Sequence, residues 1–367
     1  MPIDLIKNNI GWVKSMLKFW LSFLLTVLLV GCHPQVKPPV QIPSQITDGQ
    51  YDSEFPSKPT SPYLDKIVKS VKMVSILTFY KAYQFNLSDS ITIDKIKDGS
   101  YKNKVVQETI YEQPAAGTAT AILQSGKEIL FLTCAHVVSS KDTSIIYYAS
   151  EQDSKRKSKY IYSFAKKMRQ ISSIISIPRA SQPVIVAEDA KTDLALISVT
   201  LVEQPHLPIP VFSFPFGKAA QLHWGTFVYL IGYPKGKLLL TPTVVSAPNR
   251  DRQHDFLLNA TLARGISGGI VLALRDGVPN FELVGITNAL NAQVQYYLKP
   301  EFKAKETFVD RSMPYTGKIF LGQRLSENSN IVFAISAETI VRFIRDHRQQ
   351  IEDAGFKVPA HFPAQAK

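Results

Sequence analysis

Short apolar runs bounded by turn residues occur throughout the middle of the 367-residue chain. Runs of this length and spacing are typical of β-strands rather than helices. The first group predicts strands over 71–85 and 110–132. The second group predicts a strand near Val211 and strands over 227–231, 238–245, 256–258, 269–274 and 283–287. The pattern therefore predicts an all-β protein with two successive groups of strands, one in a domain at 63–205 and one in a domain at 206–330.

The pattern changes near the C-terminus. Ser336 is a good N-cap residue, and apolar residues at helical spacing follow it as far as Arg345. We expect a helix here, with a short tail after Phe356. The helix and tail together occupy 331–367.

The N-terminus carries three lysines, at positions 7, 14 and 18, before an apolar run over 19–30. A cationic start followed by a short apolar core is typical of a signal peptide, with an uncleaved signal anchor as the alternative. The core ends in Gly31-Cys32, which resembles the bacterial lipobox, where the cysteine becomes the acylated first residue. This resemblance implies a lipoprotein signal peptide over 1–31 and lipidation, including palmitate, on Cys32.

Residues 32–62 are rich in proline and poor in large apolar side chains. Such a segment cannot pack a core, so we expect an extended tether, with partner binding as the alternative. In Gram-negative lipoproteins an aspartate after the acylated cysteine retains the protein in the inner membrane. His33 instead implies a lipid-anchored protein of the bacterial cell envelope, on the outer membrane and facing the periplasm.

Three short motifs carry candidate chemistry. His136 ends the sequence 133–136, Asp193 opens an apolar strand at 193–197, and Ser267 lies in Gly265-Ile266-Ser267-Gly268-Gly269. A serine hydroxyl becomes a nucleophile when a histidine takes its proton and a carboxylate orients that histidine. The order His, Asp, Ser is the chymotrypsin order, and α/β-hydrolases and subtilisin use other orders.

Asp142 and Asp189 are alternative carboxylates. Asp142 follows His136 too closely in the chain, and Asp189 lacks a following apolar strand. Asp193 is therefore the better candidate.

The motifs and their surroundings resemble the trypsin-like serine proteases, most closely the bacterial HtrA type. The residues that carry the resemblance are 135–138 (AHVV) after a glycine-containing strand pair, the strand 193–197, and 231–234 (IGYP). The resemblance implies the chymotrypsin-like fold, which is all-β, with two six-stranded antiparallel β-barrels and a C-terminal helix. It covers about 71–348. The short tail leaves no room for the PDZ domain of many HtrA-type enzymes, so we expect none.

The resemblance also implies that the backbone N–H groups of Gly265 and Ser267 form an oxyanion hole. Glycine suits this turn because it adopts positive φ and allows close backbone approach. Ile266 stands where related enzymes have Asp or Asn, and an aliphatic side chain cannot pair with a newly cleaved N-terminus. We therefore expect packing or substrate to order the turn.

The family pattern places Thr261 at the base of the substrate pocket, facing the strand that holds Ile286 and Asn288. These residues carry no charge. Recognition of Lys or Arg needs a buried counter-charge, so we expect a small or medium uncharged side chain at the P1 position of the substrate.

The chain has two cysteines. If Cys32 is acylated, no disulfide can form. Cys134 lies in an apolar run, and we expect a buried, inert thiol on the side away from Ser267 rather than a reactive one. The sequence contains no CxxC, HExxH or histidine cluster, so no metal or other cofactor is expected.

The formal net charge is +12, and seven cations fall between Lys155 and Arg169 with no acidic residue among them. They belong to an insertion of about 151–176 in the first barrel, which we expect to be a solvated loop. The alternative is a surface for an anionic partner such as lipid headgroups. Nucleic acid is not expected because export removes the protein from it, and the sequence does not indicate an oligomeric state.

These observations predict a membrane-tethered serine endopeptidase that hydrolyses peptide bonds of exported proteins through an acyl-enzyme intermediate. Its nucleophile would be Ser267, its general base His136 and the orienting carboxylate Asp193. The alternative is a catalytically inactive lipoprotein of the same fold that binds a protein or an anionic envelope partner.

Overall fold

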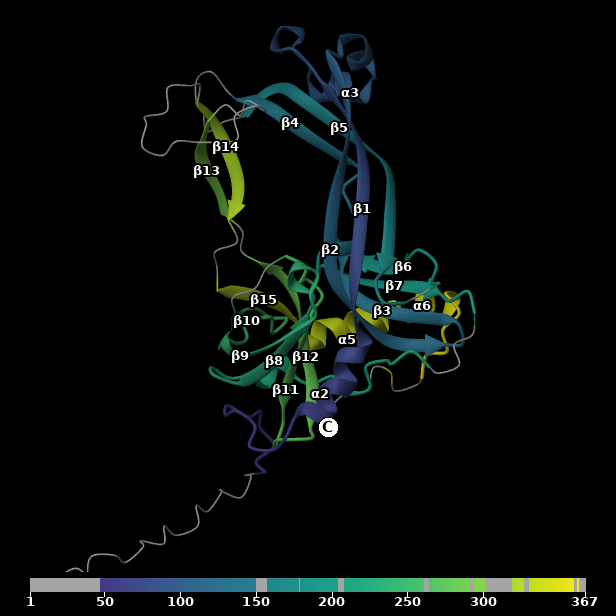
Figure 1. Ribbon diagram of the computed structural model, residues 1–367, viewed down its shortest axis with the longest axis vertical. Helices are drawn as coiled ribbons and strands as arrows, with labels where there is room; N and C mark the ends of the chain where they lie inside the picture. The colour runs from purple at the N-terminus through teal and green to yellow at the C-terminus, as the bar shows by residue number, and fades with distance from the viewer. Residues whose placement is uncertain are drawn as a thin grey trace, which may run out of the picture. The chain divides into compact units, whose positions relative to one another are not determined.

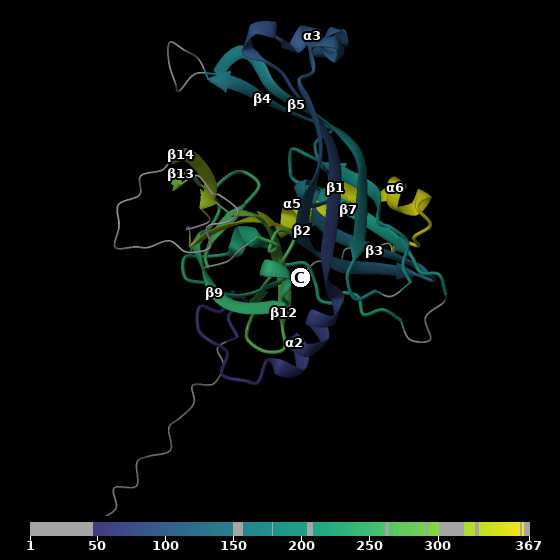
Figure 2. The same ribbon diagram turned by 45° about the horizontal axis from the view of Figure 1, so that its top comes forward.

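The computed structural model describes residues 47–149, 157–177, 179–203, 208–260, 264–290, 293–300, 319–326, 330–359 and 362. These residues form two main β-sheets followed by two C-terminal helices (Figure 1 and Figure 2). The predicted chymotrypsin-like, all-β fold class is confirmed.

The first sheet has seven antiparallel strands in the order β4-β5-β1-β2-β3-β7-β6. The two outermost strands, β4 and β6, do not pair with each other among the described residues, so this sheet is a half-barrel and not the closed six-stranded barrel that the sequence predicted. The sheet has seven strands and not six because both β4 and β5 lie beyond β1 in the strand order. The strands are β1 (Val71–Gln84), β2 (Gln107–Ser125), β3 (Glu128–Cys134), β4 (Thr143–Ala149), β5 (Lys157–Ile174), β6 (Val184–Asp189) and β7 (Leu194–Thr200).

The basic segment expected to be a solvated loop is instead strand β5, which pairs with β1 and β4. Apolar residues between the cations explain this, because Ile161 and Phe164 are buried in a cluster with Phe85. Two of the cations are engaged within the sheet: Lys167 forms an ion pair with Asp142, and Arg169 lies 4.3 Å from the ring centre of Phe79. A role of this segment toward an anionic partner stays a prediction.

This cluster lies at the far end of the ribbon formed by β1, β2, β4 and β5, where α3 and two 3-10 helices cover it (Figure 1). The helices are α3 (Ile93–Lys97), η2 (Leu87–Asp89) and η3 (Ser100–Lys104).

The second sheet is a closed six-stranded barrel with the order β10-β15-β12-β11-β8-β9. Its interior is filled by buried apolar side chains, among them Leu230, Phe256 and Val271. The strands are β8 (Phe227–Gly232), β9 (Leu239–Ala247), β10 (Phe256–Asn259), β11 (Ile270–Leu274), β12 (Phe281–Leu290) and β15 (Ile331–Ser336). A separate hairpin pairs β13 (Gln293–Pro300) with β14 (Ile319–Ser326).

The predicted C-terminal helix is present as α5 (Ala337–Asp346), followed by α6 (Arg348–Asp353). Ser336 caps α5 as expected, because its hydroxyl accepts a hydrogen bond from the Thr339 N–H. Ile340 and Ile344 are buried in the large apolar cluster that also contains residues of both sheets. The other helical turns are α2 (Ser61–Ile67), η1 (Val68–Ser70), α4 (Ala135–Val138), η4 (Ala219–Gln221) and η5 (Pro234–Gly236).

Among the residues that the structure describes, no helix combines the length and the apolar character needed to cross a membrane. The predicted signal peptide, Cys32 and the first part of the tether lie outside the described residues.

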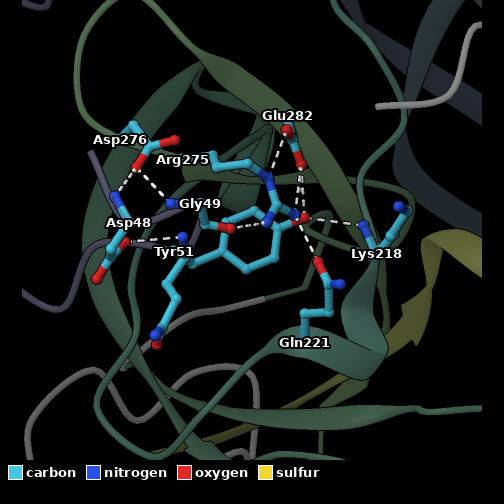
Figure 3. A network of polar contacts seen from close by, with 9 residues as sticks. Asp48, Gly49, Tyr51, Lys218, Gln221, Arg275, Asp276 and Glu282 are labelled. Atoms are coloured by element: carbon cyan, nitrogen blue, oxygen red, sulfur yellow. Dashed lines mark hydrogen bonds and ion pairs between the residues drawn. The ribbon is translucent and has the colours of Figure 1, made fainter. Parts of the chain in front are cut away.

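Part of the expected tether is attached to the second barrel. The Asp52 N–H donates to the Leu274 carbonyl, and Tyr51 is 5% exposed. The tyrosine is held by a polar network (Figure 3), in which its hydroxyl donates to Glu282 at 2.6 Å and the Arg275 guanidinium lies 4.1 Å from its ring centre. Arg275 also bonds Glu282 at 2.9 Å and the Gly49 carbonyl at 2.5 Å. The prediction of a spacer as far as residue 62 was therefore wrong for 48–52, because one tyrosine and its polar partners suffice to hold this segment.

We expect the Arg275–Glu282 pair to contribute strongly to stability, since Glu282 is buried and loses its counter-charge if Arg275 is removed. Arg275→Ala should lower the free energy of unfolding by about 3–5 kcal/mol. Urea denaturation of the purified protein measures this change. The matched control is Arg179→Ala, which removes a 2.8 Å ion pair with Glu203 whose side chains are 71% and 72% exposed. That variant should lose less than about 1 kcal/mol, and equal losses in the two variants would contradict the account.

Candidate active site

Strand register brings His136 and Asp193 together. Strand β3 pairs with β7 so that Cys134 lies opposite Leu194. His136 follows β3 on the short helix α4, and Asp193 precedes β7. Because the two strands are antiparallel, the end of one and the start of the other meet at the same edge of the sheet.

The carboxylate of Asp193 holds the histidine at two points. Its Oδ2 atom lies 2.6 Å from Nδ1 of His136, and its Oδ1 atom accepts the His136 backbone N–H at 2.9 Å. The Asp193 carbonyl accepts the Ala135 N–H at 3.0 Å. Asp193 has a φ of +57°, a left-handed conformation that aspartate tolerates better than most residues. With Nδ1 directed at Asp193, Nε2 is the ring nitrogen left to act as a base.

The rival carboxylates have other partners. Asp142 pairs with Lys167, and Asp189 accepts hydrogen bonds from the Lys191 N–H and the Thr192 hydroxyl. Asp193 is thus the carboxylate that the structure places at His136.

The turn with Ser267 is fixed from β12. The Thr287 hydroxyl donates to the Ile266 carbonyl at 2.7 Å, and the Thr287 N–H donates to the Gly269 carbonyl at 2.8 Å. The Gly268 N–H donates in turn to the Thr287 carbonyl at 2.7 Å. Ser267 itself is half-buried. Within the described part of the chain, no hydrogen bond joins its hydroxyl to the His136 imidazole.

The predicted oxyanion donors are free of competing acceptors. Neither the Gly265 N–H nor the Ser267 N–H donates a hydrogen bond to another described residue. The carbonyl groups of the same two residues are both occupied, by the side chain and the N–H of Thr118. Unpaired amides at this turn leave room for an anionic oxygen as the acceptor.

Ile266 shows how the turn keeps its shape. Its side chain is 1% exposed, belongs to the core of the second barrel and packs closely against Gly232. The Ile266 side chain is therefore held by packing, and whether substrate also orders the turn stays a prediction.

Cys134 is buried as predicted, and its expected position on the side away from Ser267 stays a prediction. Its Sγ atom, a ring nitrogen of His136 and a carboxylate oxygen of Asp193 all lie within 4.8 Å of one another, because Cys134 is the last residue of β3. The thiol donates to the Thr287 carbonyl at 3.2 Å. Burial raises the pKa of this thiol well above its usual value, and the Asp193 carboxylate raises it further. A thiol kept protonated is a poor nucleophile and a poor metal ligand.

The predicted substrate pocket is only partly described. Thr261 lies outside the described residues. Ile286 is 0% exposed in the core shared by the two sheets, so its side chain offers no surface to a substrate and its assignment to the pocket was wrong. It pairs with Ile270 and Ile335 on the neighbouring strands. Asn288 is half-buried at the end of the same strand.

Sequence reasoning missed two threonines, Thr118 and Thr287. Both are fully buried and hydrogen-bond to the Ser267 turn. Thr118 lies in a glycine-containing run that the sequence predicts only as a strand. A polar residue inside an apolar strand must find a hydrogen-bond partner when it is buried, and this is the signal that could have identified it.

Comparison with known protein families gives a match that covers all three candidate residues. Residues 117–286, which include His136, Asp193 and Ser267, match the family model of the trypsin-like peptidase domain. No curated protein matches. Among the solved structures that match is an HtrA-type protease with a decapeptide, with 15% sequence identity, 81% of this chain and 68% of that chain covered, and a TM-score of 0.40.

Gly268 tests how tightly the serine turn is enclosed. Its φ is +84°, and a Cβ atom there would lie 2.0 Å from the Thr118 carbonyl oxygen. Gly225 has nearly the same φ, +82°, but open space around it. Gly225→Ala should therefore cost only the left-handed strain, about 1–2 kcal/mol. Gly268→Ala should lower the free energy of unfolding by clearly more than that, and urea denaturation of the two variants measures both losses. Equal effects at the two glycines would show that the turn is not enclosed as described.

Proposed function

We propose that this protein is a serine endopeptidase with Ser267 as nucleophile, His136 as general base and acid, and Asp193 as the residue that orients the imidazole. The observation that carries the proposal is the double contact of Asp193 with His136, which leaves Nε2 available. Two further observations support it: the Gly265 and Ser267 amides donate to no acceptor among the described residues, and residues 117–286 match the trypsin-like peptidase domain.

The proposed reaction uses these groups in sequence. Nε2 of His136 takes the proton of the Ser267 hydroxyl as the oxygen attacks the peptide carbonyl. The oxyanion that forms accepts hydrogen bonds from the Gly265 and Ser267 N–H groups. His136 then gives its proton to the leaving amine, and a water molecule hydrolyses the acyl-enzyme by the same route. Asp193 stays ionised and stabilises the imidazolium.

The resting structure has no hydrogen bond between Ser267 and His136 within its described residues. This does not oppose the proposal, since catalytic hydrogen bonds are often long before substrate binds and shorten in the complex. The 47% exposure of the His136 side chain is consistent with a site open to a polypeptide. The preference for an uncharged P1 residue stays part of the proposal.

The fluorophosphonate reaction tests the enzyme, because this probe labels a serine that a histidine activates. We expect wild-type protein to be labelled, Ser267→Ala to lose all labelling and His136→Ala to lose nearly all. Asp193→Asn should reduce kcat about 10⁴-fold. Ser139→Ala is the matched control, because Ser139 is an exposed serine three residues after His136. This variant should keep the labelling of the wild-type protein.

Two results would contradict the proposal. Labelling that survives in Ser267→Ala would place the nucleophile elsewhere. An unlabelled, folded wild-type protein that also cleaves no peptide would favour the alternative, a lipoprotein that binds a protein or an anionic envelope partner without catalysis.

We also propose that Cys32 carries a lipid that holds the enzyme at the cell envelope, on the outer membrane and facing the periplasm. The attachment of residues 48–52 to the second barrel supports a short tether between lipid and enzyme. The fourteen residues 33–46 can span at most about 50 Å when fully extended. The proposed substrates are therefore exported proteins that come close to the membrane.

Two cysteine variants test the lipid anchor. Cys32→Ser should move the protein from the membrane fraction to the soluble fraction of a bacterial host and abolish palmitate incorporation. Cys134→Ser is the control, because its side chain is buried and a hydroxyl keeps the hydrogen bond to Thr287, so this variant should behave as wild type. Membrane association that survives in Cys32→Ser would indicate an uncleaved signal anchor instead.

A further inference from the structure

We propose that Thr118 is a positioning residue that holds the turn with the nucleophile and the oxyanion donors in register with the strand that carries the histidine. The inference rests on the proposed function, because it assigns Thr118 a role in the same reaction. Thr118 lies on β2 of the first sheet, whereas Ser267 belongs to the second barrel.

Every polar atom of Thr118 forms a hydrogen bond, and the residue is 0% exposed. Its N–H donates to the Ser267 carbonyl at 2.8 Å, and its hydroxyl donates to the Gly265 carbonyl at 2.8 Å. The same hydroxyl accepts the Tyr233 N–H at 2.9 Å. Its carbonyl accepts the Thr133 hydroxyl at 2.7 Å.

These bonds hold the peptides next to those that carry the oxyanion donors. A trans peptide is planar, so a fixed carbonyl also fixes the N–H of the following residue, which points the opposite way. The Arg264 carbonyl is held by the Lys235 N–H at 2.7 Å, which directs the Gly265 N–H. The Ile266 carbonyl is held by Thr287, which directs the Ser267 N–H. Thr118 holds the two remaining peptides, those that follow Gly265 and Ser267, so four successive peptides are fixed.

Thr118 comes from a different sheet than the other residues that hold this turn. Tyr233, Lys235 and Thr287 belong to the second barrel or its connections, and Thr118 comes from the first sheet. Through Thr133, it is also bonded to β3, the strand that ends directly before α4, the helix that carries His136. A continuous path of hydrogen bonds therefore runs from the histidine strand through Thr133 and Thr118 to Gly265 and Ser267.

The contact leaves little freedom for movement. A Cβ atom at Gly268 would lie 2.0 Å from the Thr118 carbonyl oxygen, and one at Gly232 would lie 2.9 Å from its hydroxyl oxygen. The turn can keep this close approach only while Thr118 presents its polar atoms as described.

The neighbouring Thr120 provides a matched control on the same strand. It is 1% exposed, and its hydroxyl has no hydrogen-bond partner among the described residues. Thr→Val is nearly isosteric, so Thr118→Val removes two hydrogen bonds and Thr120→Val removes none.

The test compares kcat and KM for peptide hydrolysis, with urea denaturation for each variant. Thr118→Val should lower kcat about 100-fold with little change in KM, because displacing the donors affects the transition state more than substrate binding. Thr118→Ser keeps both side-chain bonds and should recover activity to within a few-fold of wild type. Thr120→Val should match wild type in kcat and be at least as stable.

Thr133→Val gives a second test should Thr118→Val fail to fold. It removes only the bond to the Thr118 carbonyl, and we expect kcat to fall about tenfold with KM unchanged.

An active wild type whose Thr118→Val variant keeps its kcat would overturn the inference and leave the proposed function intact. The inference would also be overturned if Thr118→Ser lost as much kcat as Thr118→Val. If Thr118→Val does not fold, a Thr133→Val variant that keeps wild-type kcat would overturn it instead. A wild-type protein that hydrolyses no peptide and takes no serine-directed probe would overturn the proposed function, and the inference with it.

Discussion

The structure depends on the contact between two sheets at the turn that carries Ser267. There is no space for a side chain at Gly268, where the Thr118 carbonyl approaches the backbone. This approach lets a buried N–H of the first sheet reach the Ser267 carbonyl in the second barrel at 2.8 Å. Buried backbone groups must be paired, so the close contact also satisfies groups that neither sheet can pair by itself. It joins the turn that carries Ser267 to the sheet that precedes His136.

The two halves of the candidate site are held in different ways. The histidine half relies on charge and backbone together, since both oxygens of Asp193 and its carbonyl bond to residues 135 and 136. The serine half relies on neutral hydrogen bonds and on the burial of Ile266. Packing of this kind needs no ion pair with a cleaved N-terminus. Cys134 lies beside His136 and Asp193, and burial raises the pKa of its thiol.

Much of this could be predicted from the sequence. Apolar runs predicted the two groups of strands, Ser336 predicted the helix cap, and two of the three motifs supplied residues that the structure brings into contact, His136 and Asp193. Each of these predictions depends on a pattern within a few neighbouring residues of the sequence. The failures involved contacts over long distances in the chain. Tyr51 is buried by residues more than 200 positions away, and Thr118 meets a turn about 150 positions away. Strand β5 was hidden because its cations masked the buried Ile161 and Phe164 between them. Ile286 was assigned to a pocket because the family pattern gives a strand but not which of its side chains face the core.

The most direct test of the central claim is the pre-steady-state reaction with a chromogenic ester. If His136 activates Ser267, the leaving group should appear in a burst of about one equivalent per protein, and the acyl group should be found on Ser267 by peptide mass spectrometry. Linear release with no burst, or an acyl group on any other residue, would contradict the account.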